Sequence, residues 1–115
     1  MPLHWLDEPQ HHDFAAAADY LSLVLEQNEV EQLVHGLREA KTVQRKAKDI
    51  LRASRLELLP KTDPHVAADL AKAQLSPILL VRDAKTRTLV IADGYHRACA
   101  SYWADEDTEI PCRLV

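Results

Sequence analysis

The first sixty residues place apolar side chains at the spacing of helices. Apolar positions recur every three or four residues from Phe14 to Gln27, and Asp13 can cap this segment. Asn28 fits a capping box for a second helix, whose apolar positions share one face: Val30, Leu33, Val34 and Leu37. A third helical pattern covers about 43–53. The RLELL segment that follows reads either as a short strand or as the tail of that helix.

The pattern changes after residue 60. Thr62 and Asp63 are cap candidates for a short helix with Pro64 at its first position, and this helix ends before Ser76-Pro77. Two β-rich runs, PILLV and TLVIA, flank an RDAKTR turn and predict a hairpin. YHRACASYWA predicts a helix, and IPCRLV predicts a last strand in which Pro111 suits an edge position or a strand start.

These elements predict an α/β (α+β) fold. We expect an N-terminal helical extension at 1–45, packed on a core domain at 46–115 that holds a small mixed sheet with helices. A chain of 115 residues with 47% apolar content is sufficient for one compact domain.

Composition narrows the function classes. The net charge of −4 argues against direct DNA binding, for which a basic surplus is expected. No apolar run approaches the ~20 residues that span a bilayer, so we expect no membrane partner. The start of the chain has no apolar signal segment, and Cys99 and Cys112 make no disulfide framework, which together predict a reduced cytoplasmic protein. With only Gly36 and Gly94, a glycine-rich phosphate loop is excluded.

The DGYHR segment, residues 93–97, is the strongest candidate for a site. A strand runs into Asp93-Gly94, and a helix begins at about Tyr95, where unpaired N–H groups carry partial positive charge. Arg97 lies in this first turn, as does His96, which is a cation when protonated, and the helix dipole disfavours each cation by about 0.3–1 kcal/mol. A bound phosphate would reverse that penalty. In the alternative interpretation, Arg97 pairs with Asp93 or another acid and His96 is an ordinary surface residue.

The order of these elements resembles the ParB N-terminal/sulfiredoxin-like superfamily over about 46–115. The resemblance consists of an apolar strand opening with Pro-Ile, a second strand, Asp-Gly-x-His-Arg, a helix and a closing Ile-Pro strand. It implies binding of a nucleotide such as ATP, ADP or CTP, with the turn at 93–97 against the phosphates. His96 and Arg97 would contact phosphate oxygens, and Asp93 would orient the turn or hold Mg²⁺.

Departures from the family pattern exclude some of its activities. Tyr95 stands where sulfiredoxin has its catalytic cysteine, and a phenol is a poor replacement for a thiolate, so we do not expect a sulfiredoxin. Cys99 is expected to be a buried apolar side chain. Glu57 is a weak candidate for the base that a serine kinase branch would need. Because the sequence stops at Val115, we expect it to lack the DNA-binding domain with which the partition proteins act in segregation.

Sulfiredoxin also takes phosphate ligands from the helix before the hairpin, where this chain offers His65, Asp69 and Lys72. The basic segment at 38–55 includes Lys48 and Arg52, which are either accessory cations for the phosphate site or part of a solvated helix face.

The predicted function is therefore binding of a nucleotide or phosphorylated small molecule, with phosphoryl transfer or nucleotide hydrolysis as the reaction if the chain is an enzyme. The alternative is a non-catalytic interaction or regulatory module on the same scaffold, and the apolar faces of the first two helices leave a homodimer open.

Overall fold

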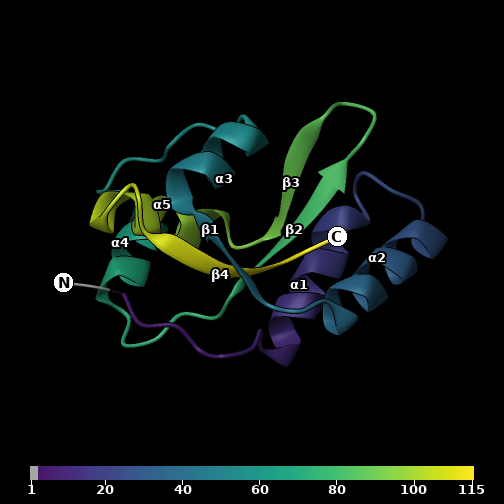
Figure 1. Ribbon diagram of the computed structural model, residues 1–115, viewed down its shortest axis with the longest axis horizontal. Coiled ribbons are helices and arrows are strands. Elements are labelled where there is room, and N and C mark those ends of the chain that lie inside the picture. The colour runs from purple at the N-terminus through teal and green to yellow at the C-terminus, as the bar shows by residue number, and fades with distance from the viewer. Residues whose placement is uncertain (1–2) are drawn as a thin grey trace.

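A computed structural model describes residues 3–115, and Figure 1 shows its helices and strands. In chain order the elements are α1 (His11–Leu21), α2 (Gln27–Glu39), β1 (Val43–Lys46), α3 (Ala47–Ser54), α4 (Pro64–Ala71), β2 (Ile78–Asp83), β3 (Thr88–Asp93), α5 (Tyr95–Ala104) and β4 (Glu109–Leu114). The predicted α+β class is confirmed, since helices are combined with a mixed sheet of four strands in the described part of the chain.

The sheet has the strand order β1-β4-β2-β3. β2 and β3 pair antiparallel as the predicted hairpin, with Leu80 opposite Ile91. β4 runs parallel to β2 and antiparallel to β1. Pro111 therefore lies in an interior strand and not at a sheet edge, one residue before pairing with β2 begins at Cys112.

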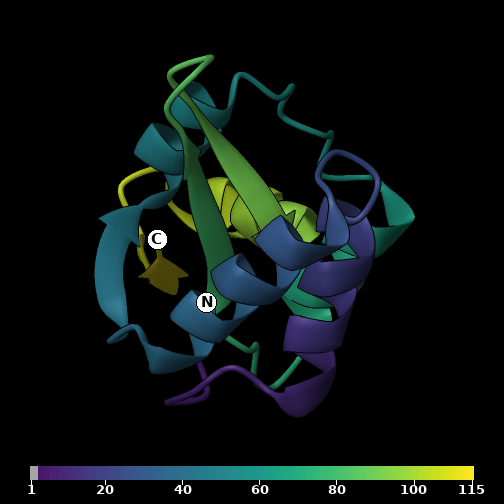
Figure 2. The same ribbon diagram turned by 90° about the vertical axis from the view of Figure 1, so that its right-hand side faces the viewer.

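Helices cover both faces of the sheet, as Figures 1 and 2 show from two sides. Ile78 and Leu80 of β2 pack into a core with α3, α4 and α5. Leu79 and Val81 point to the other face and pack against α1 and α2. Because alternate side chains of β2 enter two different cores, this strand reads as a continuous apolar run in the sequence. The N-terminal helices are thus one layer of the fold.

Several element boundaries in the structure differ from those predicted from the sequence. The helix expected over 43–53 is a strand at Val43–Lys46 followed by α3, because these four residues pair with β4. Arg55 adopts left-handed backbone angles (φ 58°) and ends α3, so RLELL forms neither a strand nor a helix tail. The 45/46 boundary between the expected extension and core domain falls inside β1.

The capping residues at the starts of α4 and α1 compare differently with the prediction: that of α4 is as predicted and that of α1 is not. Asp63 caps α4 as predicted, since its Oδ1 accepts from the N–H groups of His65 (2.9 Å) and Val66 (3.1 Å). In α1 the capping residue is Gln10, and Asp13 is the third residue of the helix, where its Oδ2 accepts the Gln10 N–H at 2.7 Å. No helix within residues 3–115 is both long and apolar enough to cross a membrane.

Candidate functional site

A cleft of about 210 Å³ lies where β3 ends and where α4 and α5 lie side by side. Its lining comes from α4 and the residue after it, and from the DGYHR segment: His65, Ala68, Asp69, Lys72, Asp93, Gly94, Tyr95, His96 and Arg97. All five residues predicted for the turn line this cleft, and so do the three polar residues of the preceding helix.

Gly94 shapes the turn between β3 and α5. Its φ of 115° lies in the region that L side chains rarely adopt, and a Cβ at this position would lie 2.3 Å from Ile78 Cγ2. The backbone therefore packs directly on β2, which fixes where α5 begins.

The first turn of α5 differs from that of α4. α4 is capped by its own Asp63, whereas no side chain caps α5. The first N–H groups of a helix have no partner within the helix, so the start of α5 presents donors and partial positive charge beside the cleft.

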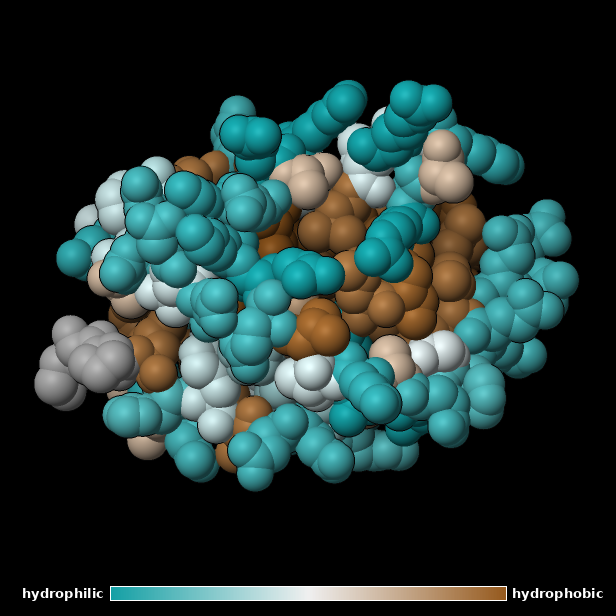
Figure 3. Space-filling view, in the orientation of Figure 1, coloured by the Kyte–Doolittle hydropathy of each residue, from teal (hydrophilic) through white to brown (hydrophobic). Residues whose placement is uncertain are grey.

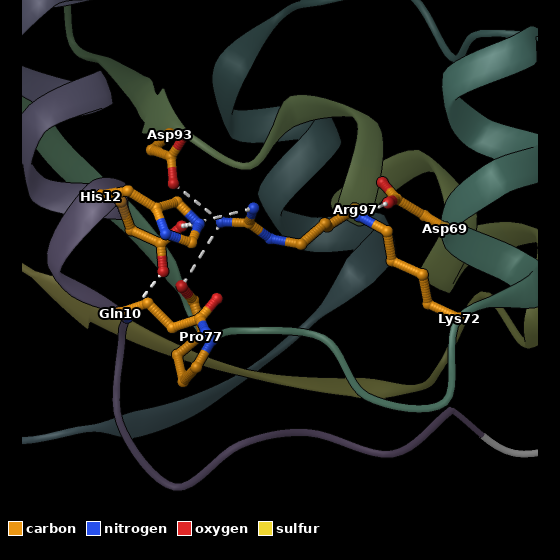
Figure 4. Close-up of polar contacts among 8 residues, drawn as sticks. Gln10, His12, Asp69, Lys72, Pro77, Asp93 and Arg97 are labelled. Carbon is orange, nitrogen blue, oxygen red and sulfur yellow. Dashed lines mark hydrogen bonds and ion pairs between the residues drawn. The ribbon is translucent and has the colours of Figure 1, made fainter.

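Arg97 is held inside the protein by two carboxylates. Its Nη2 donates to Asp93 Oδ2 at 2.9 Å and its Nη1 lies 3.8 Å from Asp13 Oδ1, while Pro77 O is 3.5 Å from Nη2. The side chain is 15% exposed and that of Asp13 only 2%. Figure 4 shows the guanidinium directed to Asp93 and away from Asp69 and Lys72. This is the alternative interpretation of Arg97, with one partner, Asp13, that sequence spacing did not indicate.

Burial has the largest effect on the pKa of Asp93 in this ion cluster. It raises the pKa of Asp93 above its ordinary value, Arg97 opposes the shift, and the nearby Asp13 carboxylate adds to it. The cluster holds two acids and one guanidinium, so α1 is tied to the 93–97 turn through charged groups that are largely shielded from water.

Other polar side chains line the cleft. The rings of His65 and His96 are 4.8 Å apart between centroids, and those of Tyr95 and His96 are 5.6 Å apart. Lys72 Nζ lies 3.2 Å from Asp69 Oδ1. Two imidazoles and one ammonium group therefore face the same space from α4 and α5.

The candidate catalytic groups do not gather here. The Tyr95 hydroxyl donates to the main-chain oxygen of Glu57, and burial raises the pKa of this phenol. Glu57 contacts Tyr95 through that carbonyl, and its exposed side chain does not line the cleft. Cys99 is buried, as predicted, and burial raises the pKa of its thiol, which disfavours a nucleophilic thiolate.

The cations predicted to assist the site lie elsewhere. Lys48 Nζ pairs with Asp107 Oδ1 at 3.0 Å, in the loop that follows α5. The ten residues of α5 separate that loop from the turn by about 15 Å. Neither Lys48 nor Arg52 lines the cleft, because α3 begins beside the C-terminal end of α5. The lysine that lines the cleft is Lys72.

A magnesium ion at Asp93 has little support from the residues present. The Asp93 carboxylate already accepts from Arg97, and Asp69 is paired with Lys72. Within residues 3–115 no group of three or more His, Cys, Asp or Glu side chains is arranged to hold a metal.

Comparison with known proteins adds no identity: no family model, curated protein or solved structure matches the chain. The resemblance to the ParB N-terminal/sulfiredoxin-like superfamily stays a prediction.

Proposed function

We propose that this protein binds the phosphate group of a nucleotide or phosphorylated small molecule in the cleft between α4 and α5. The observation that carries the proposal is the uncapped start of α5, which opens on a space shared with His65, Lys72 and His96. Main-chain N–H groups at a helix start, together with cationic side chains, are the donors that phosphate oxygens prefer.

The size of the cleft sets how much of a ligand it encloses. Pockets that enclose whole drug-sized ligands measure roughly 300–1,000 Å³. A cleft of about 210 Å³ suits a phosphate group, with the base and sugar of a nucleotide extending outside. We therefore expect ATP, ADP and CTP to be distinguished weakly, and inorganic phosphate to compete with each of them.

The proposal gives Arg97 a different role from the one that the family resemblance implies. Because Asp93 and Asp13 hold its guanidinium, Arg97 acts as a positioning residue for the turn, and the phosphate contacts fall to the main chain, His96 and His65. Lys72 joins them because its side chain is 58% exposed and pairs with one acid, Asp69, so that its ammonium group can contact a phosphate as well. A phosphate that drew Arg97 away would leave the buried Asp13 and the half-buried Asp93 without their cation, which opposes that movement.

The proposal covers binding and not a chemical step. Asp93 and Asp69, the acids that line the cleft, are both ion-paired, so neither is free to act as a general base. The ParB/sulfiredoxin-like assignment is part of the same proposal; the order hairpin, glycine turn, helix and strand supports it.

Thermal unfolding with ligands tests the site directly. ATP, ADP, CTP and inorganic phosphate should each raise the melting temperature, since a ligand at 100 times its Kd stabilises the folded state by about 2.7 kcal/mol. Adenosine, which lacks a phosphate, should not. Lys72→Ala and His96→Ala should reduce the shift in melting temperature. Lys48→Ala should leave the shift unchanged, because Lys48 lies in α3 beside the loop that follows α5. Equal shifts with adenosine, or none with any phosphate compound, would overturn the proposal.

A further inference from the structure

A second hollow lies on the sheet face that α1 and α2 cover. It measures about 450 Å³ and runs between the β2–β3 hairpin and the α1–α2 connection. Its apolar lining comes from both sides: Leu21, Val24, Leu25, Leu33, Val81 and Val90. Figure 3 shows a brown area on the facing side of the molecule, bordered by teal side chains. We call this hollow the hairpin groove.

Apolar side chains beside the hairpin groove are unusually exposed. Leu23 is 81% exposed and Val24 61%, both in the turn that follows α1. Single exposed apolar residues are common, but a groove of leucine and valine with the exposed Leu23 at its border is typical of a protein interface. If a partner covered these side chains, their removal from water would stabilise the complex relative to the isolated chain.

The two borders of the hairpin groove carry opposite charge. On the helical side, Glu29 is the charged residue of the groove lining. On the hairpin side, Arg82, Asp83 and Lys85 line the groove and carry a net charge of +1. Asp83 accepts the Lys85 N–H at 3.0 Å and stays charged, so the hairpin border keeps one cation in excess.

We infer that a second copy of this chain covers the hairpin groove, related by a two-fold axis that runs along it. In a symmetric dimer the same patch meets itself, so the patch must be self-complementary. A two-fold axis along the groove brings the acidic border of each copy over the basic border of the other. An axis across the groove would bring like charges together, which the charge pattern disfavours. The apolar centre would then be removed from water between two oppositely charged borders.

This arrangement pairs Glu29 of each copy with the hairpin cations of the other, and charge reversal tests that pairing. We expect sedimentation velocity of the wild-type chain to show a monomer–dimer equilibrium between about 1 µM and 1 mM. Glu29→Lys and Lys85→Glu should each weaken the dimer roughly tenfold, because each reverses two symmetry-related pairs. An equimolar mixture of the two variants should recover the wild-type affinity, since all its cross-pairs are again of opposite charge.

Two further variants separate this face from others. Val24→Asp, at an exposed position, should abolish the dimer and leave the circular dichroism spectrum unchanged. Its melting temperature should equal that of the wild type at concentrations where the wild-type chain is monomeric. Glu39→Lys makes the same charge change as Glu29→Lys about 15 Å further along α2 and should have no effect. A wild-type chain that stays monomeric at 1 mM, a dimer that survives Val24→Asp, or a mixture of charge variants that fails to associate would each overturn the inference. Because none of these residues lines the phosphate cleft, failure here would leave the phosphate proposal standing.

Discussion

The ion cluster of Asp13, Asp93 and Arg97 permits a quantitative prediction. The cluster contains one more acid than cations, so either carboxylate can be neutralised while Arg97 keeps a partner. Neutralising both would leave a guanidinium that is 15% exposed without any counter-ion. We therefore expect the effects of Asp13→Asn and Asp93→Asn on the free energy of unfolding to be strongly non-additive.

The magnitudes follow from what each variant leaves behind. Asp93→Asn loses a charged hydrogen bond but relieves repulsion between two acids, so we expect a loss of about 1 kcal/mol. Asp13→Asn should cost about 1–2 kcal/mol, because Asp13 also accepts the Gln10 N–H at the start of α1. The double variant should lose about 4–5 kcal/mol, since removing the last partner of a buried charge costs about 3–5 kcal/mol. The expected coupling energy is thus about 2 kcal/mol.

Urea unfolding of the wild-type chain, both single variants and the double variant measures this coupling. A double variant whose loss equals the sum of the two single losses within about 0.5 kcal/mol would refute the reasoning. The pH dependence supplies a second check on the same variants. Because burial raises the pKa of Asp93, its contribution to stability is fully present below its ordinary pKa of 3.8 and is lost as the pH rises through the folded-state pKa. The stability of the wild-type chain relative to Asp93→Asn should therefore fall as the pH rises from below 3.8 toward neutral, and a rise would contradict the assigned shift.

Three further predictions concern the packing around the site. Gly94→Ala should cost about 3 kcal/mol in urea unfolding, because its Cβ would meet Ile78 and its backbone would be strained; a loss below 1 kcal/mol would mean that the turn relaxes freely. Asp63→Ala should cost about 1 kcal/mol, the usual effect of losing a helix cap, and Asp63→Asn should restore most of it. Cys99 and Cys112 should react slowly with a thiol reagent at neutral pH and rapidly in urea, because both are buried and burial raises the pKa of Cys112 to about 11; fast reaction of the folded protein would show that these cores open readily.

The candidate site was partly predictable from local signals. A strand, a glycine and a helix start at 93–97 indicated an anion site, and the same five residues line the cleft. Local spacing also offered Asp93 as a partner for Arg97, four residues away. No local signal indicated Asp13, because it is far from Arg97 in the sequence and comes near it only when α1 packs against the sheet. Lys72 was offered by the family resemblance, but its position at the cleft also depends on how α4 lies against α5.

Elements with local causes could be predicted from the amino-acid pattern: the β2–β3 hairpin, the cap and proline at the start of α4, and the helix after Gly94. In each, the side chains restrict their own backbone or contact neighbours within a few residues, so a short window holds the physical cause. Val43–Lys46, in contrast, forms a strand because it pairs with β4 at the other end of the chain, and no local pattern indicates this pairing. Tertiary packing likewise enclosed Arg97 between two acids from different layers, because burial and ion pairing depend on which surfaces meet and not on the spacing within either segment.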